Sequence, residues 1–289
     1  MSSSLVEYIG PYRLINAVYT GQTSRTWQAY NDRERRYVGI KTLFYRTSQD
    51  ASQVALIKWE YDVGSKLHHE RIIEMQEFGK HQKIPYIVME WYAGINIKQI
   101  INRGYENYCV ELPVMIPQML EALHYLHSQG WVHRDVKPDN FLYLPEKGIK
   151  LIDFALAKSI KVNPLVKLLR IRSKPQGTGS YMSPEQILGQ PLDGRSDIYS
   201  LACSFFEMLS ARPTFTGVTI DDLLQKHLTG SIPSITARNQ NVTPEFSELL
   251  KNMMSKNPDR RPQSAKDILH ILRTTRIFRK KPEIGDTVH

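Results

Sequence analysis

The pattern of apolar and polar residues changes near residue 92, from one typical of strands to one typical of helices. This change constrains the fold more than any other feature of the sequence. Residues 12–44 form short stretches of alternating apolar and polar residues, rich in Val, Ile, Tyr and Thr, which predict an antiparallel meander. Helical spacing follows over residues 54–67, and two further short strands are expected at residues 74–78 and 86–91. A strand-rich part with one main helix therefore comes first.

The second part of the chain has a mainly helical pattern. Its clearest element is predicted over residues 113–129, where Gly130 closes the helix and an apolar stripe comprises Ile116, Met119, Leu120, Leu123 and Leu126. With 289 residues, the chain exceeds the size at which one hydrophobic core usually stops growing. We therefore expect an α+β protein with two lobes, the first rich in strands and the second rich in helices.

Composition excludes several classes of protein. Hydrophobic residues make up 41% of the chain and charged residues 23%, which are values of an ordinary globular protein. No apolar run approaches the length that spans a bilayer, and the first ten residues lack a secretory pattern. Cys109 and Cys203 lie far apart in apolar surroundings, so we expect reduced core cysteines and a cytoplasmic protein.

The net charge of +9 favours acidic partners without selecting one kind. Much of the excess lies in residues 158–174, which contain no acid, and in residues 273–281. We expect both segments to be solvated surface. Basic residues interleaved with aromatic residues are not found, so no nucleic-acid partner is expected.

The richest chemistry lies between His133 and Asp153. The sequence HRDVKPDN ends at Asn140 and is followed by the strand-like stretch IKLIDF, which contains Asp153. Phosphoryl transfer requires a carboxylate that orients the attacking hydroxyl and oxygen ligands that hold magnesium against the phosphates. Asp135 suits the first task, and Asn140 and Asp153 suit the second.

These motifs, together with SPE at residues 183–185, resemble the catalytic loop, the magnesium loop and the end of the activation segment of the protein kinase family. The resemblance covers residues 12–272 and implies a small antiparallel-sheet N-lobe with one main helix (12–91) and a larger helical C-lobe (92–272). A lead of residues 1–11 and a basic tail of residues 273–289 flank it. The sequence around the motifs resembles that of bacterial serine/threonine kinases of the eukaryotic type, with some likeness to casein kinase 1.

The resemblance implies a role for several residues. Asp135 is the catalytic carboxylate, and Lys137 marks serine/threonine specificity because a cation there neutralises the γ-phosphate during transfer. Lys41, in VGIK, grips the α- and β-phosphates and pairs with Glu60. The implied ATP site comprises Val18, Gly21, Thr26, Gly39, Lys41, Met89, Glu90, Tyr92, Asn96, Asn140, Leu142 and Asp153, with Mg²⁺ on Asn140 and Asp153.

Further residues are implied to support this site. Thr178 would contact Asp135 and Lys137, and Glu185 would form a buried ion pair with Arg261. Asp197 resembles the residue that holds the backbone of the catalytic loop, although it could instead cap the helix that follows.

The sequence departs from the family pattern in the glycine-rich loop, at Ala155 and at Gly64. Only Gly21 remains of the three glycines that cover the phosphates, which is expected to weaken or reshape nucleotide binding. Ala155 stands where the family has glycine, and we expect it to bias the magnesium loop towards one state. Gly64 replaces a side chain that packs between helix and sheet, so a hole there would leave the helix with Glu60 loosely placed.

The implied function is transfer of the γ-phosphate of ATP to serine or threonine hydroxyls of proteins. Arg134 favours activation by a phosphate on the activation segment, with Ser173 as the candidate for autophosphorylation and Ser159 and Thr178 as the other hydroxyls. The alternative is a pseudokinase that acts as a binding scaffold or allosteric partner. A small-molecule kinase of the aminoglycoside type is disfavoured because it does not need the GT…SPE segment.

Overall fold

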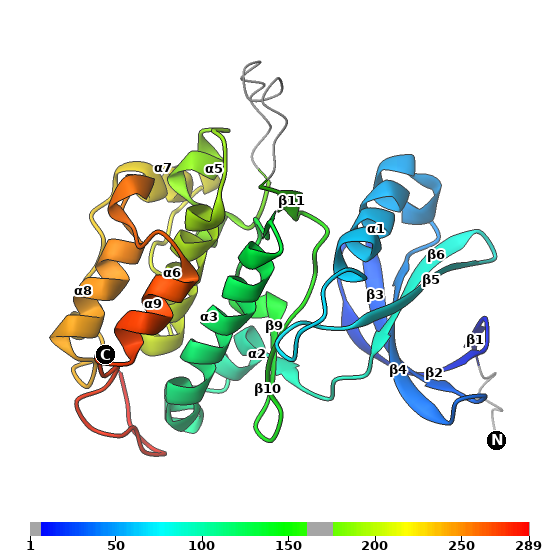
Figure 1. Cartoon of the computed structure of the whole chain (residues 1–289), viewed down its shortest axis with the longest axis horizontal. Coiled ribbons are helices and arrows are strands. Elements are labelled where there is room, and N and C mark those ends of the chain that lie inside the picture. The colour runs from blue at the N-terminus through cyan, green and yellow to red at the C-terminus, as the bar shows by residue number, and fades with distance from the viewer. Residues whose placement is uncertain (1–6, 161–175, 289) are drawn as a thin grey trace. The chain divides into compact units, whose positions relative to one another are not determined.

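The computed structural model describes residues 7–160 and 176–288. The chain divides into two compact units, coloured from blue to cyan and from green to red in Figure 1. Unit 1 comprises the chain up to Ala93 together with Asp153–Ala155, and unit 2 comprises Gly94–Ile152 and the chain from Leu156 onwards. The division falls close to residue 92, where the residue pattern changes.

The core of unit 1 is a curled antiparallel sheet with the strand order β1-β2-β3-β4-β6-β5. β2 to β4 are consecutive neighbours, which confirms the predicted meander. Buried residues such as Ala29, Val38 and Ile40 form its apolar cluster. The strands are β1 (Tyr8–Ile9), β2 (Tyr12–Thr20), β3 (Ser24–Asn31), β4 (Arg36–Leu43), β5 (Met75–His81) and β6 (Ile84–Glu90).

Helix α1 (Ala51–Gly64) packs against β4, β5 and β6. It begins three residues earlier than the apolar spacing predicted, because the side chain of Asp50 accepts a hydrogen bond from the backbone N of Ser52 at 2.8 Å and so caps the helix. Ile57, Glu60 and Gly64 are buried on one face. This face presents Glu60 to the interior of unit 1.

Unit 2 is mainly helical and is built around α3 (Leu112–Ser128). α3 contacts α6 (Gly194–Ser210), α9 (Ala265–Leu272) and strand β10 (Gly148–Leu151). All five residues of the predicted apolar stripe are 0% exposed. The chain leaves α3 through Gly130, whose φ of 81° explains the glycine at this turn. The predicted helix is confirmed to within one residue at each end.

Short strands flank the loops that carry the chemistry of unit 2. β9 (Phe141–Leu144) pairs with β10 and with β7 (Ile95–Asn96), and β8 (Trp131–Val132) pairs with β11 (Lys158–Ser159). The segment between β8 and β9 is the HRDVKPDN loop, which is thus held at both ends. The other helices are α2 (Ile97–Ile101), α5 (Pro184–Ile187), α7 (Ile220–Thr229) and α8 (Pro244–Met253), with 3₁₀ turns that include η1 (Thr47–Gln49, in unit 1), η4 (Pro138–Asn140) and η5 (Gly179–Tyr181).

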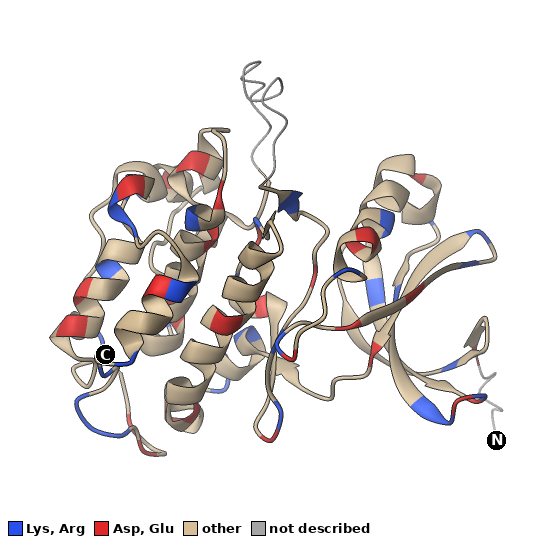
Figure 2. Cartoon of the chain, in the orientation of Figure 1, with Lys and Arg blue, Asp and Glu red and all other residues tan. Residues whose placement is uncertain are grey.

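The tail beyond α9 packs on unit 2. Phe278 forms a β-bridge with Val242 and is 7% exposed. The backbone N of Arg279 donates to the carbonyl of Asn241 at 2.7 Å, and the hydroxyl of Thr243 donates to the carbonyl of Arg276 at 2.6 Å. The expectation of solvated surface therefore holds for the cationic side chains, which colour this loop blue in Figure 2, but not for Phe278. Most of the other basic segment, residues 158–174, lies outside the described residues.

Within the described residues, no helix is long and apolar enough to cross a membrane.

Candidate active site

The structure brings predicted site residues together in two groups, one within each unit. In unit 1, the ammonium of Lys41 donates to both carboxylate oxygens of Glu60, at 2.8 and 2.7 Å. The same ammonium lies 3.6 Å from a carboxylate oxygen of Asp153. The side chain of Glu60 is 3% exposed, whereas that of Asp153 is 39% exposed. Lys41 therefore links a buried carboxylate to an accessible one.

Burial sets the electrostatics of this group. Burial raises the pKa of Glu60 to about 7, although Lys41 opposes the shift, and the negative charge of Asp153 raises the pKa further. Burial by itself would lower the pKa of Lys41, but Asp153 and Glu60 outweigh it, and the pKa lies above its ordinary value. Lys41 is thus charged near neutral pH, while Glu60 is poised to titrate there.

The backbone strain of the magnesium loop lies at Asp153 and not at Ala155. Asp153 has a φ of 65°, in the left-handed region that non-glycine residues seldom adopt. Ala155 is not among the described residues with positive φ, and its backbone N donates to the Asp153 carboxylate at 3.3 Å. Alanine therefore fits this conformation of the loop without strain at its own position.

The hairpin between β2 and β3 replaces a glycine-rich loop by an anchored turn. The backbone N of Gly21 donates to the carbonyl of Ser24 at 2.9 Å. The carbonyl of Thr23 accepts from the backbone N of Phe44 at 3.0 Å and from the hydroxyl of Thr47 at 2.6 Å. These bonds tie the tip of the hairpin to the end of β4 and to η1, so the turn is supported although it has only one of the three glycines.

The remaining predicted nucleotide-binding residues of unit 1 lie along this hairpin and the strands beyond it. Thr26 pairs with Lys41 in the β3–β4 register, and Gly39 pairs with Met89 in the β4–β6 register. The backbone N of Glu90 donates to the carbonyl of Glu74 at 2.9 Å, which fixes the end of β6. Val18 is 45% exposed and Tyr92 is 5% exposed.

Gly64 does not leave the expected hole. A Cβ at this position would lie 2.8 Å from Cε and 3.0 Å from Cγ of Met75 and would overlap its sulfur. The side chain of Met75, which comes from β5 and is 5% exposed, occupies the space. The expectation that α1 is loosely placed at this point is wrong, because a strand residue supplies the packing that the helix lacks.

In unit 2, the second group surrounds Asp135. One carboxylate oxygen of Asp135 accepts from the backbone N of Thr178 at 2.9 Å and from its hydroxyl at 3.0 Å. The other lies 2.6 Å from the ammonium of Lys137, which also donates to the hydroxyl of Thr178 at 2.7 Å. The amide of Asn140 donates to the backbone carbonyl of Asp135 at 2.8 Å. Asp135, Lys137, Asn140 and Thr178 are thus one connected cluster.

Asp197 supports the loop that carries this cluster. Its carboxylate is 0% exposed and accepts from the backbone N of His133 at 2.7 Å and of Arg134 at 2.8 Å. His127 contacts the same carboxylate at 2.9 Å. The cap of α6 is Asp193, whose side chain accepts from Arg195 N. The alternative that Asp197 caps the helix is therefore wrong. Asp197 instead holds the backbone of the HRDVKPDN loop, as the resemblance implied.

Glu185 and Arg261 form the buried ion pair that the resemblance implied. Two parallel bonds join them, at 2.7 and 2.9 Å, and Ser196 donates to Glu185 at 2.7 Å. Burial by itself would raise the pKa of Glu185, but the bonds from Arg261 and Ser196 lower it below its ordinary value. Glu185 is therefore a carboxylate at neutral pH, and its partner Arg261 is anchored to the backbone after α8.

Unit 2 contains two arrangements that the sequence did not indicate, at Asn96 and around Glu207. Asn96, expected to face a ribose, caps α2 in a capping box with Gln99, so its side-chain oxygen already accepts a backbone hydrogen bond at 2.8 Å. The buried carboxylate of Glu207 accepts from Lys98 and Tyr181. Nothing in the sequence marked this trio, because its members lie on α2, η5 and α6. Leu142 lies in β9, where it pairs with Lys150.

Arg134 is buried and carries a positive charge with little compensation. Its Nε has no hydrogen-bond partner in the described part of the chain, and burial lowers its pKa in spite of Asp197. Burial also lowers the pKa of Lys158, and Arg134 lowers it further. Ser173, the candidate for autophosphorylation, lies outside the described residues.

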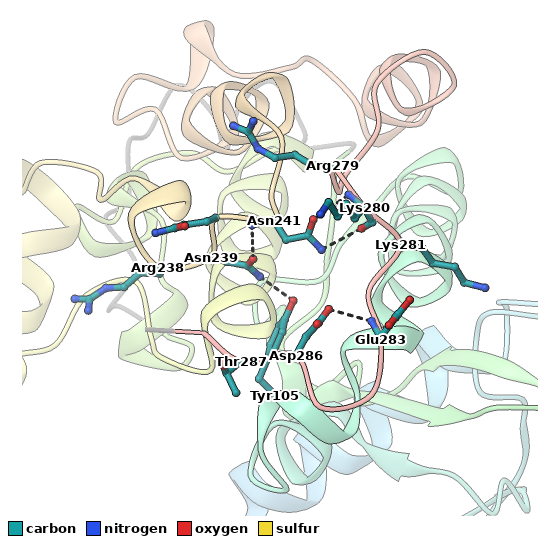
Figure 3. A pocket seen from close by; sticks show the side chains of 11 residues that line it. Tyr105, Arg238, Asn239, Asn241, Arg279, Lys280, Lys281, Glu283, Asp286 and Thr287 are labelled. Atoms are coloured by element: carbon teal, nitrogen blue, oxygen red, sulfur yellow. Dashed lines mark hydrogen bonds between the residues drawn. The ribbon is translucent and has the colours of Figure 1, made fainter.

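A pocket of about 570 Å³ lies at the tail of unit 2. In Figure 3 the tail residue Asp286 lies beside Tyr105, and Lys280 lies beside Asn241, while Arg238 and Lys281 extend to opposite sides. The amide of Asn239 donates to the hydroxyl of Tyr105 at 2.8 Å. None of the predicted site residues lines this pocket.

The match to known proteins extends across both units of the chain. A family model described as protein kinase domain matches residues 12–272. A probable serine/threonine-protein kinase of Streptomyces coelicolor is 30% identical over 263 residues, which cover 90% of this chain and 39% of that protein. Serine/threonine-protein kinase PknB of Mycolicibacterium smegmatis is 29% identical over 89% of this chain and 41% of its own length.

Serine/threonine-protein kinase PknA of Mycobacterium tuberculosis is 29% identical over 96% of this chain and 64% of its own length. The chain thus spans about two fifths of the first two relatives and less than two thirds of the third. These relatives support the bacterial likeness and do not bear on casein kinase 1. With a family match over 12–272 and relatives of one kind along nearly all of its length, the chain belongs to the protein kinase domain family.

Proposed function

We propose that the chain is a serine/threonine protein kinase domain that transfers the γ-phosphate of Mg·ATP to hydroxyls of proteins. The observation that carries the proposal is the cluster of Asp135, Lys137 and Thr178. The hydroxyl oxygen of Thr178 lies 3.0 Å from the Asp135 carboxylate and 2.7 Å from the Lys137 ammonium. The cluster has the geometry that a hydroxyl nucleophile needs, with an acceptor for its proton and a cation beside its oxygen.

Each residue of the cluster has a separate task in this proposal. Asp135 orients the substrate hydroxyl and accepts its proton as the bond to phosphorus forms. Lys137 stabilises the negative charge that develops on the transferred group. Asn140 donates to Asp135 and so fixes the carboxylate. Thr178 connects this cluster to the segment that precedes SPE, where a substrate peptide would bind.

Lys41 and Asp153 are proposed to hold the nucleotide phosphates and the metal. The ammonium of Lys41 is charged and held by Glu60, as a phosphate ligand requires. Oxygen donors suit Mg²⁺, and Asp153 offers an accessible carboxylate, while the side chain of Asn140 donates through its nitrogen and keeps an amide oxygen as a ligand. Bound magnesium would neutralise phosphate charge. The described residues contain no group of three or more His, Cys, Asp or Glu side chains suited to a metal, so phosphate oxygens would complete the coordination.

The nucleotide base is proposed to bind beside Val18, Thr26 and Gly39, and along the hinge from Met89 to Tyr92. Gly21 would lie over the phosphates, and Leu142 would contact the base. Asn96 would face the ribose while its side-chain oxygen also accepts the backbone hydrogen bond that caps α2.

A phosphotransfer assay tests the proposed function. The purified chain is incubated with Mg²⁺, radiolabelled ATP and a basic protein substrate, alongside Asp135→Asn. We expect label on serine or threonine with the wild type and a loss of at least a hundredfold with the variant. Absence of transfer by both proteins would contradict the proposal and favour the pseudokinase alternative, which no observation on the described residues now supports.

We also propose regulation by a phosphate on the activation segment. Arg134 and Lys158 form a cationic site in which the Nε of Arg134 lacks a partner within the described residues, and a phosphate would satisfy it. Autophosphorylation at Ser173 or Ser159 would supply the phosphate. Mass spectrometry of protein activated with Mg·ATP tests this, since fully active protein without phosphate in residues 153–183 would exclude it.

A cytoplasmic place of action accords with the use of ATP and with the two free, buried cysteines. Fractionation of cells that produce the full-length protein would test it. Recovery of the kinase domain outside the cytoplasmic membrane would be the contrary result.

A further inference from the structure

Two glycines in unit 1 each face a methionine. At Gly64 a Cβ would meet Cε and Cγ of Met75 at 2.8 and 3.0 Å, and at Gly39 a Cβ would meet Cγ of Met89 at 2.9 Å. Real Cβ atoms almost never come within 3.0 Å of a non-bonded heavy atom, so the space that a side chain would need at each glycine is already filled. Met75 and Met89 are partners in the β5–β6 register. Two neighbouring methionines therefore fill gaps in two different elements.

Both gaps adjoin the Lys41–Glu60 pair. Gly64 follows Glu60 by four residues on the same buried face of α1, and residues at this spacing are neighbours on a helix. Gly39 precedes Lys41 by two residues in β4 and so points to the same face of the sheet. Met75 therefore fills a gap on the helix that carries Glu60, and Met89 fills a gap on the strand that carries Lys41.

The three atoms nearest to a Cβ at Gly64 all belong to one side chain from another element. Glycine weakens the last turn of α1, because it lowers helix propensity and offers no side chain to pack. Methionine is unbranched and fits irregular gaps that a branched residue cannot enter. Because Met75 is 5% exposed, its removal would leave a void that water does not readily fill.

We propose that Met75 is a positioning residue that substitutes for the side chain missing at Gly64 and holds α1 where Glu60 engages Lys41. Glu60 contacts Lys41 through two bonds of 2.8 and 2.7 Å, and such bonds weaken when α1 shifts by a fraction of an ångström. The effect of Met75 on α1 stands independently, whereas its effect on catalysis rests on the proposed kinase function.

An exchange of side chains between strand and helix tests the proposal. Met75→Ala empties the space, Gly64→Leu overfills it, and the double variant refills it from the helix. Met119→Ala is the matched control, because Met119 is 0% exposed in α3 of unit 2 and contacts neither glycine. All proteins are compared well below their unfolding temperatures, so that a loss of stability alone does not change the readouts.

Hydrogen exchange of the α1 amides is the first readout and does not depend on catalysis. We expect Met75→Ala to speed exchange over residues 57–64 at least tenfold, the double variant to restore it to within threefold of the wild type, and Met119→Ala to leave it unchanged. Unchanged exchange in Met75→Ala, or no recovery in the double variant, would overturn the inference.

Steady-state kinetics are the second readout. We expect Met75→Ala to lower kcat/KM for ATP at least tenfold, the double variant to recover most of it, and Met119→Ala to stay within twofold of the wild type. If the exchange pattern is found but the wild type transfers no phosphate, the proposed function fails and the role of Met75 on α1 stands. If the wild type is active and Met75→Ala retains full kcat/KM, the positioning role fails.

Discussion

Buried charges at single positions decide most of the chemistry in this chain. Glu60, Glu185 and Asp197 are each at most 4% exposed, and each carboxylate is met by a cation or by backbone N–H groups. A buried carboxylate without such partners would be costly. The fold therefore has to bring a partner for each carboxylate from another part of the chain, and in each case it does.

The ion pair of Glu185 and Arg261 offers a stability test. Arg261→Ala leaves a buried carboxylate without its cation, and we expect a loss of about 3–5 kcal/mol in the free energy of unfolding, measured with urea. The control is Lys251→Ala, which breaks a pair whose side chains are both 61% exposed and should change stability by less than about 1 kcal/mol. Equal effects of the two substitutions would contradict the assignment.

The raised pKa of Glu60 predicts a pH dependence of nucleotide use. As the pH falls through about 7, Glu60 gains a proton and loses much of its attraction for Lys41. We expect kcat/KM for ATP to decline on the acid side with an apparent pKa near this value. Glu60→Gln should lower the plateau and abolish this limb, because the amide does not titrate. A limb that persists in Glu60→Gln would assign the titration to another group.

Elements owe their ends and positions to contacts that are local for some and distant for others. α3 ends where Gly130 adopts a positive φ, a signal that is visible in the sequence. α1 begins at Ala51 because of the Asp50 cap, and it is held at Gly64 by Met75 from another element. The tail is fixed by Asn241 and Val242, about 40 residues before it, which no local pattern could indicate.

The packing of the tail predicts that it contributes to stability although it lies beyond residue 272, where the family match ends. Phe278 is 7% exposed, and Phe278→Ala should cost about 3 kcal/mol in the free energy of unfolding, measured with urea. Lys281→Ala, at an exposed position of the same segment, should have little effect. A stable Phe278→Ala variant would show that the tail can detach without consequence for unit 2.

At the scale of the whole molecule, each unit carries a complete part of the chemistry. Unit 1 holds Lys41, Glu60 and Asp153, and unit 2 holds Asp135, Lys137 and Asn140. Lys41 and Asp135 should therefore respond differently to substitution. Lys41 is proposed to bind phosphates in the ground state, whereas Asp135 acts on the substrate hydroxyl during transfer.

Thermal unfolding with and without Mg·ATP separates these roles. A ligand present at a hundred times its Kd stabilises the native state by about 2.7 kcal/mol. We expect a higher Tm with Mg·ATP for the wild type and for Asp135→Asn, and a much smaller increase for Lys41→Met. Loss of the increase in Asp135→Asn, or its retention in Lys41→Met, would contradict the proposed division of roles.

Sequence reasoning was most successful where the signal is local. The strand meander, the helix over residues 113–129 and the order of the motifs were all visible in the sequence, because the periodicity of side chains and the turn residues are encoded nearby. The contacts of Thr178 with Asp135 and Lys137 followed from the family resemblance. The hole expected at Gly64 was wrong, and the expectation of a solvated tail missed the packing of Phe278. The capping role of Asn96 was not foreseen.

The sequence by itself determined the class of the two lobes, the motifs and the residue types that can perform phosphoryl transfer. Only the tertiary structure decided that Met75 fills the gap at Gly64, that Phe278 and Asn241 fix the tail, and that Lys98 and Tyr181 meet Glu207. The physical reason is that a side chain's own neighbours along the chain set its helix or strand periodicity. Which distant atoms fill a gap or satisfy a buried charge depends on how the elements pack.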